Sequence, residues 1–130
     1  MRLYTVEEAR AALPEVIPIV KRIRETFLKL RAIQAAVASA SRVAEADGAL
    51  TANPWDSGSD NRLERLNRRL RADAARLDRL GIELKDPEIG LIDFFSEREG
   101  RVVYLCFKLG EESIQYWHTL EGGYAGRQPL

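Results

Sequence analysis

The strongest structural signal in this chain is an apolar residue at every seventh position of its first half. The run comprises Val16, Ile23, Leu30, Val37 and Ala44. Leucines recur in the same way over residues 63–80. This spacing places apolar side chains on one stripe of a helix. We therefore predict two long helices, joined by a loop over residues 48–60, that form an antiparallel, coiled-coil-like hairpin.

Local signals predict where these helices begin and end. Thr5 and Glu8 have the spacing of a capping box, in which each side chain accepts a hydrogen bond from the other residue's backbone. Pro14 is expected to interrupt the helix that starts there, because proline disfavours helical geometry in the residue before it and can begin the next helix. Gly48 and Gly81 are predicted to end the two long helices.

After residue 81 the apolar pattern changes to the two-residue period of β-strands. The clearest strands are RVVYLCFKL and ESIQYWH, with weaker ones before them, so the predicted ranges are 82–84, 89–95, 101–109 and 112–118. The tail GGYAGRQPL, residues 122–130, is predicted to be a loop. The predicted fold class is therefore α+β. A single domain over residues 1–130 comprises a helical hairpin (1–81) and a small antiparallel sheet of three or four strands with its tail (82–130).

A two-residue turn between the last two strands fixes their expected register. It pairs Cys106 with Gln115 and Val103 with His118. Because successive residues of a strand point to opposite faces, Cys106 and His118 are then expected on opposite faces of the sheet. This register argues against a metal site shared by the only cysteine and the only histidine, although a bulge near His118 would reverse it.

His118 is the residue with the most chemical potential. It is expected at a strand end, partly accessible, where Glu121 and Asp93 could join it around a divalent metal ion. One histidine with carboxylates lacks the spaced pair of His or Cys that makes a zinc motif specific. A structural, hydrogen-bonded His118 is therefore the alternative, and no catalytic residue is assigned.

The glycine-rich tail is a second candidate for ligand binding. Its backbone N–H groups could surround an anion, with Arg127 as the counter-charge and Tyr124 and Trp117 beside it. No helix follows the glycines, so the segment matches neither a phosphate-binding loop nor a dinucleotide fingerprint. The alternative is a tail folded onto the sheet. In the 48–60 loop, Trp55 is the candidate for partner binding, unless the helices cover it.

Charge and cysteine content bear on the function class and the compartment. The chain carries 20 basic and 20 acidic residues, so no global field favours nucleic acid or an anionic membrane. Acidic residues dilute the arginines of the second helix and no aromatics interleave, so nucleic-acid binding is not expected. A single cysteine, the polar N-terminus and the lack of an apolar run of about 18 residues predict a cytoplasmic protein.

A two-helix hairpin cannot bury its own apolar stripe, so the sheet or a second copy must cover it. We therefore expect a homodimer through the helices. The function favoured on this basis is a non-enzymatic interaction or scaffold protein. The alternative is a metal- or small-ligand-binding protein, with or without catalysis, whose site lies near His118, Glu121 and Arg127.

Three segments taken together resemble a bacterial family known as domain of unknown function 2203. They are LYTVEEARAALPEVIPIV, GIELKDPEIGLIDF and VYLCFKLGEESIQYWHTLEGGYAGRQPL. The resemblance implies a small bacterial cytosolic protein and carries no activity or active site with it. Its most distinctive segment, the last, contains Tyr104, Cys106, Trp117, His118, Glu121 and Arg127.

Overall fold

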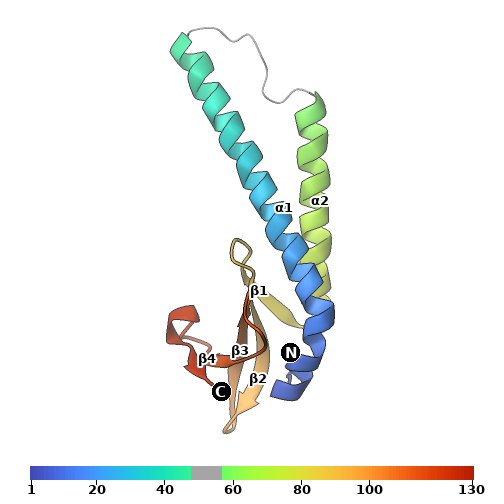
Figure 1. The fold of residues 1–130 in the computed structure, drawn as a ribbon, viewed down its shortest axis with the longest axis vertical. Helices are drawn as coiled ribbons and strands as arrows, with labels where there is room; N and C mark the ends of the chain where they lie inside the picture. The colour runs from blue at the N-terminus through green and yellow to red at the C-terminus, as the bar shows by residue number, and fades with distance from the viewer. Residues whose placement is uncertain (48–56) are drawn as a thin grey trace.

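The computed structural model of the chain describes residues 1–47 and 57–130, with side chains described for residues 1–42 and 61–130. Two helices precede a five-stranded antiparallel sheet (Figure 1), which confirms the α+β class. The elements are α1 (Val6–Asp47), α2 (Ser57–Arg79), β1 (Ile82–Asp86), β2 (Leu91–Arg98), β3 (Arg101–Lys108), β4 (Tyr116–Thr119), the short helix η1 (Tyr124–Gly126) and β5 (Gln128–Pro129). Trp55 and Gly48 lie outside the described residues.

Helix α1 is continuous over 42 residues, so the predicted interruption at Pro14 is wrong. Pro14 and Pro18 are four residues apart and both are exposed. Each removes one helical hydrogen bond, but on the exposed side of a helix the carbonyl group left over can bond to water. The opposite side keeps Leu13 and Val16 buried in the core, and this packing outweighs the local cost.

The predicted capping box at the start of α1 is confirmed. Thr5 N donates to the Glu8 carboxylate at 2.9 Å, and Glu8 N donates to the Thr5 hydroxyl at 3.0 Å. Gly81, just after α2, has the positive φ of 74° that a helix-ending glycine adopts.

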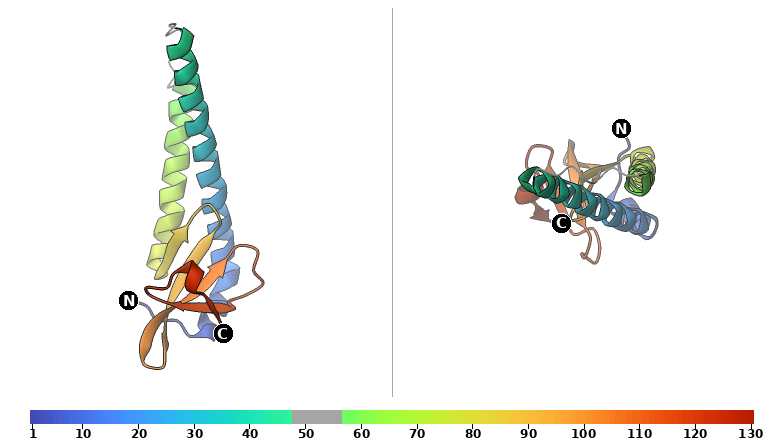
Figure 2. Two further views of the ribbon diagram at one scale, coloured as in Figure 1. Left: turned by 90° about the vertical axis from the view of Figure 1, so that its left-hand side faces the viewer. Right: turned by 90° about the horizontal axis from the view of Figure 1, so that it is seen from above.

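Helices α1 and α2 lie side by side, and the sheet packs against the N-terminal half of α1 (Figures 1 and 2). The buried core between helix and sheet comprises Ala9, Leu13, Val16, Val20 and Ile23 of α1 and Ile92, Phe94, Leu105 and Phe107 of the sheet. Asp73 interrupts the leucine stripe of α2 and is buried, and Arg22 of α1 donates to its two oxygens at 3.2 and 3.4 Å. The arginine thus gives this buried carboxylate the partner it requires. Within the described residues, neither helix has an apolar stretch long enough to span a bilayer.

The sheet is a simple meander with strand order β1-β2-β3-β4-β5. Strands β2 and β3 are joined by the tight turn Glu99-Gly100, whose φ angles of 52° and 78° are those of a left-handed two-residue hairpin turn. The fifth strand is a correction, because the tail was predicted to be loop throughout. It pairs with β4, and Leu130 N donates to the Gln115 carbonyl at 3.0 Å. A two-residue strand has no periodicity that a sequence pattern could reveal.

The predicted register between β3 and β4 is wrong by one residue. Tyr104 is opposite His118, and Cys106 is opposite Tyr116. The connection is not a two-residue turn, because β3 ends at Lys108 and β4 begins only at Tyr116. Within the connection Ile114 is fully buried in the core, so the chain needs extra residues to reach inward before β4 starts. The shift places Cys106 and His118 on the same face of the sheet, contrary to the sequence-based expectation.

Candidate metal centre

Three neighbouring strands bring Asp93, Cys106 and His118 together on the face of the sheet that points away from α1. Asp93 in β2 is opposite Cys106 in β3, and the next strand, β4, supplies His118. The residues that alternate with them, such as Phe94 and Leu105, belong to the core against α1. One nitrogen, sulfur or oxygen atom from each of the three residues lies within 4.8 Å of the other two.

All three side chains are buried, with exposed fractions of 1% for Asp93, 0% for Cys106 and 2% for His118. The expectation of a partly accessible histidine is therefore wrong. His118 lies at the third of four positions in a short strand and is buried, with the Tyr104 ring packed beside it. Buried polar groups must find partners within the protein, or they destabilise the fold.

The hydrogen-bond partners of His118 place a proton on one of its two ring nitrogens. Nδ1 lies 2.7 Å from the backbone carbonyl oxygen of Thr119. A carbonyl oxygen can only accept, so Nδ1 must carry a proton. Nε2 lies 3.1 Å from both carboxylate oxygens of Asp93. A bare ring nitrogen and a bare carboxylate would repel at this distance, so either a proton or a metal cation has to lie between them.

Burial controls the ionisation of the two acids in the group. It raises the pKa of Asp93, while the neighbouring His118 and a hydrogen bond from Cys106 oppose that rise. Burial also raises the pKa of the Cys106 thiol from 9.0 to about 12, and the negative charge of Asp93 adds to the effect. The thiol is therefore protonated at neutral pH. A buried, protonated thiol is a poor nucleophile, since the thiolate is the reactive form.

Tyr104 closes the site on the side of β1. Its ring lies 5.3 Å from the ring of His118 and 4.9 Å from the ring of Phe95. Its hydroxyl donates to the Glu83 carboxylate at 3.0 Å and accepts from the Lys85 ammonium at 3.4 Å. Lys85 also pairs with Glu83. This neighbouring network is satisfied internally, so its charges do not need Asp93 or His118 as partners.

The C-terminal tail contributes an arginine on the other side. The Arg127 guanidinium stacks 3.9 Å from the ring centre of Tyr116 and 4.9 Å from that of Tyr124. It also forms an ion pair with Glu111 in the β3–β4 connection. Its Nε is buried without a hydrogen-bond partner. The tail is thus held against the sheet by stacking and charge.

The structure brings some of the predicted site residues together and separates others. Asp93 and His118 are in contact, but Glu121 is exposed and is not among the converging ligand atoms, where Cys106 stands instead. Tyr124 contacts Arg127, as a shared site requires, whereas Trp117 points to the other face and packs against the core. Trp55 lies outside the described residues.

Cys106 is the ligand-type residue that the predicted register separated from His118. The signal that could have placed it was Trp117. In the predicted register this large apolar side chain shares a face with Lys108, whereas in the observed register it lies opposite Leu105 on the core face. Burying the indole with the leucine favours the observed register, because burial of apolar area is the larger energy term.

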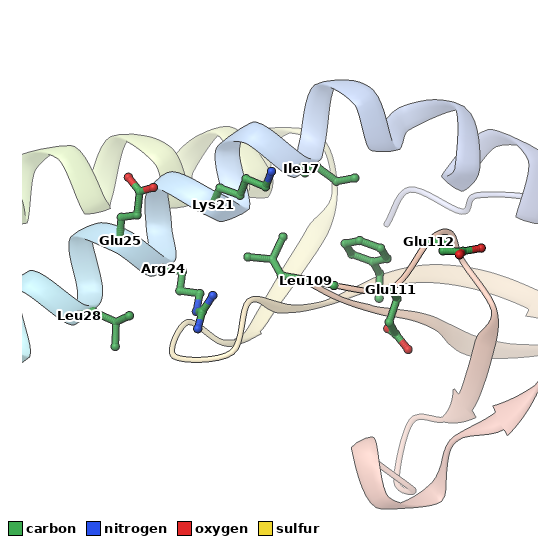
Figure 3. Close-up of a pocket in the computed structure, with 10 residues that line it drawn as sticks. Ile17, Lys21, Arg24, Glu25, Leu28, Leu109, Glu111 and Glu112 are labelled. Atoms are coloured by element: carbon green, nitrogen blue, oxygen red, sulfur yellow. The ribbon is translucent and has the colours of Figure 1, made fainter.

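The largest of the clefts described lies elsewhere. It has a volume of about 810 Å³ and runs between α1 and the β3–β4 connection (Figure 3). Its walls are apolar and charged side chains: Ile17, Lys21, Arg24, Glu25, Leu28, Phe107, Leu109, Glu111 and Glu112. Asp93, Cys106 and His118 are not among its lining residues.

Comparison with known proteins adds a family and no activity. No curated protein and no solved structure matches the chain. A family model described as "Uncharacterized conserved protein (DUF2203)" matches residues 2–130, which is essentially the whole chain. The resemblance seen in the three sequence segments is thereby confirmed, and the chain belongs to the DUF2203 family.

Proposed function

We propose that the protein binds a divalent metal ion of the zinc type through Asp93, Cys106 and His118. The observation that carries this proposal is the convergence of three buried ligand side chains, with Nε2 of His118 3.1 Å from both carboxylate oxygens of Asp93. The Nδ1 atom of His118 lies 2.7 Å from the Thr119 carbonyl oxygen, to which it donates, so Nε2 is the nitrogen left to bind a metal ion in place of the proton between it and Asp93. A backbone carbonyl that fixes the second nitrogen is the usual arrangement around a metal-bound histidine.

The geometry and the donor atoms fit such an ion. Zinc binds nitrogen and oxygen at about 2.1 Å in tetrahedral sites, which separates two such ligands by about 3.4 Å. The Nε2 atom of His118 and the Asp93 oxygens are 3.1 Å apart, so a small outward movement would admit the ion. A thiolate together with an imidazole favours zinc over magnesium or calcium, which prefer oxygen ligands.

We assign the metal a structural role, in which it fastens β2, β3 and β4 to one another. Complete burial of all three ligands supports this role, as does their absence from the lining of the 810 Å³ cleft. Three protein ligands leave room for a fourth ligand on a tetrahedral ion. A reducing cytoplasm, the compartment expected from the sequence, would keep Cys106 as the thiol that the site requires.

Elemental analysis tests the proposal directly. Protein purified without chelator, and protein reconstituted with zinc, should each hold about one ion per chain. Cys106→Ala and His118→Ala should lose it. Glu121→Ala is the matched control, since this exposed carboxylate was a sequence-based candidate ligand and should not affect the metal content.

Cobalt(II) provides a second readout, because a cobalt–thiolate bond gives an absorption band that needs Cys106. The proposal is wrong if reconstituted wild-type protein holds no zinc or cobalt. It is equally wrong if Cys106→Ala and His118→Ala retain the ion, since binding would then lie elsewhere. Circular dichroism of each variant checks that a lost ion does not simply reflect an unfolded chain.

A second candidate function, self-association as a scaffold through α1 and α2, is favoured by the upper parts of the helices. Their axes diverge toward the end far from the sheet (Figure 1). Ile33, Val37 and Leu63 are only half-buried there. We propose that a second copy covers these side chains in a coiled-coil-like homodimer. Light scattering should then give twice the chain mass of 14.7 kDa, and Val37→Glu should restore the single-chain mass; a monomeric wild type would reject the dimer.

A further inference from the structure

A small cleft between the two helices gathers positive charge. Its volume is about 190 Å³, and its lining consists of Lys29 from α1 and Arg62, Arg65, Leu66 and Arg69 from α2. Leu66 is buried with 6% of its surface exposed, whereas the four cationic residues are exposed. Among the described side chains, the cleft therefore has an apolar floor and a basic rim.

The helix geometry explains why the arginines converge. Arg62, Arg65 and Arg69 are spaced by three and four residues, so they lie above one another on one face of α2. Lys29 approaches from α1 across the line where the helices meet, since it is next to the buried Leu30. Two elements thus contribute charge of the same sign to one place.

No carboxylate lines this cleft among the side chains that the structure describes. The same two helices pair other arginines with acids, as in Arg22 with Asp73 and Arg68 with Glu64. Like charges three or four residues apart destabilise a helix. The chain as a whole has equal numbers of basic and acidic residues, so the unbalanced group is a local feature that an anion would offset.

We infer that this cleft binds a small polyphosphate anion, with inorganic triphosphate as the simplest probe. Guanidinium groups donate paired hydrogen bonds to phosphate oxygens, and a lysine adds a point charge. Of the side chains that the structure describes, none that lines the cleft is aromatic, so these residues offer no surface on which a nucleobase could stack. Recognition would therefore rest on phosphate groups rather than on a base.

The test is calorimetric titration with triphosphate in about 0.15 M salt, where contacts between distant charges are screened. Arg65→Gln/Arg69→Gln removes two charges from the cleft. Arg76→Gln/Arg79→Gln is the matched control, because it removes two exposed charges from the same helix outside the cleft. We expect the cleft variant to bind at least about tenfold more weakly, and the control to stay within about twofold of wild type.

Stability supplies an independent readout. Without anion, the cleft variant should melt at the same temperature as wild type or higher, since its like-charge repulsion is relieved. Triphosphate should raise the melting temperature of wild type and of the control only. The inference would be overturned if triphosphate affinity fell equally in both variants, or if wild type did not bind triphosphate. Tighter binding of a single-stranded oligonucleotide with equal loss in both variants would also overturn it, because the whole basic helix face would then bind a nucleic-acid backbone.

Discussion

Replacing Cys106 with alanine should alter how the stability of the metal-free protein depends on pH. The thiol ionises near pH 9.0 when exposed, but burial raises its pKa to about 12 in the folded chain. A raised pKa means that the folded state keeps the proton after the unfolded state has lost it. The contribution of the protonated thiol to the free energy of unfolding is complete below pH 9. It is lost progressively as the pH rises toward 12.

The size of the effect follows from these two values. Between pH 8 and pH 10 the thiol ionises in the unfolded chain and not in the folded one. Proton linkage then lowers the free energy of unfolding by about 1.4 kcal/mol. The free energy of unfolding of Cys106→Ala does not fall in this way, because the variant has no thiol. The small cavity left by the substitution lowers its free energy of unfolding by about 1 kcal/mol at either pH. Wild type should therefore be the more stable protein at pH 8, and the two should be about equal at pH 10.

Urea unfolding in the presence of a chelator measures the free energy of unfolding of wild type and Cys106→Ala at pH 8 and pH 10. Tyrosines and lysines also titrate in this range, but both proteins contain them, so their contribution cancels in the difference. An equal change in unfolding free energy for wild type and Cys106→Ala would refute the assignment of a buried, protonated thiol. Adding zinc to wild type should remove the alkaline loss, because a metal-bound thiolate has no proton to retain.

Three further outcomes follow from the same contacts. Zinc binding should release about two protons, one from Cys106 and one from the Asp93–His118 pair, and calorimetry in buffers of different ionisation enthalpy counts them. Asp73→Leu, which completes the leucine stripe of α2 and leaves Arg22 free to reach solvent, should be neutral or stabilising by about 1 kcal/mol in thermal unfolding. Gly100→Ala should cost about 1 kcal/mol in urea unfolding, because its φ of 78° lies in the left-handed region.

Features fixed by neighbouring residues could be predicted from the sequence. The capping box at Thr5 and the glycine that follows α2 depend on a few adjacent residues, and both are present. The helices and the main strands follow from periodicities that persist over many residues. Pro14 was misread because its cost is local, whereas the packing that offsets it comes from the sheet, which is distant in sequence.

The candidate site could be predicted only in part, because it depends on the register between β3 and β4. That register is set by where Ile114 is buried, which no local turn signal reveals. A slip of one residue moves His118 to the opposite face. Asp93 and His118 were both identified as ligand candidates, but the sequence could not show that Cys106, rather than Glu121, completes the group.

Cys106→Ser distinguishes a metal ligand from a residue that only fills space. In the metal-free protein the thiol makes only a weak hydrogen bond to Asp93. A serine hydroxyl is the stronger donor, so the metal-free stability of Cys106→Ser should be close to that of wild type. The same hydroxyl is a poor zinc ligand, so zinc binding should be lost. If the serine variant bound zinc as tightly as wild type, Cys106 would not be a ligand, and Asp93 with His118 would form only a buried hydrogen-bonded pair.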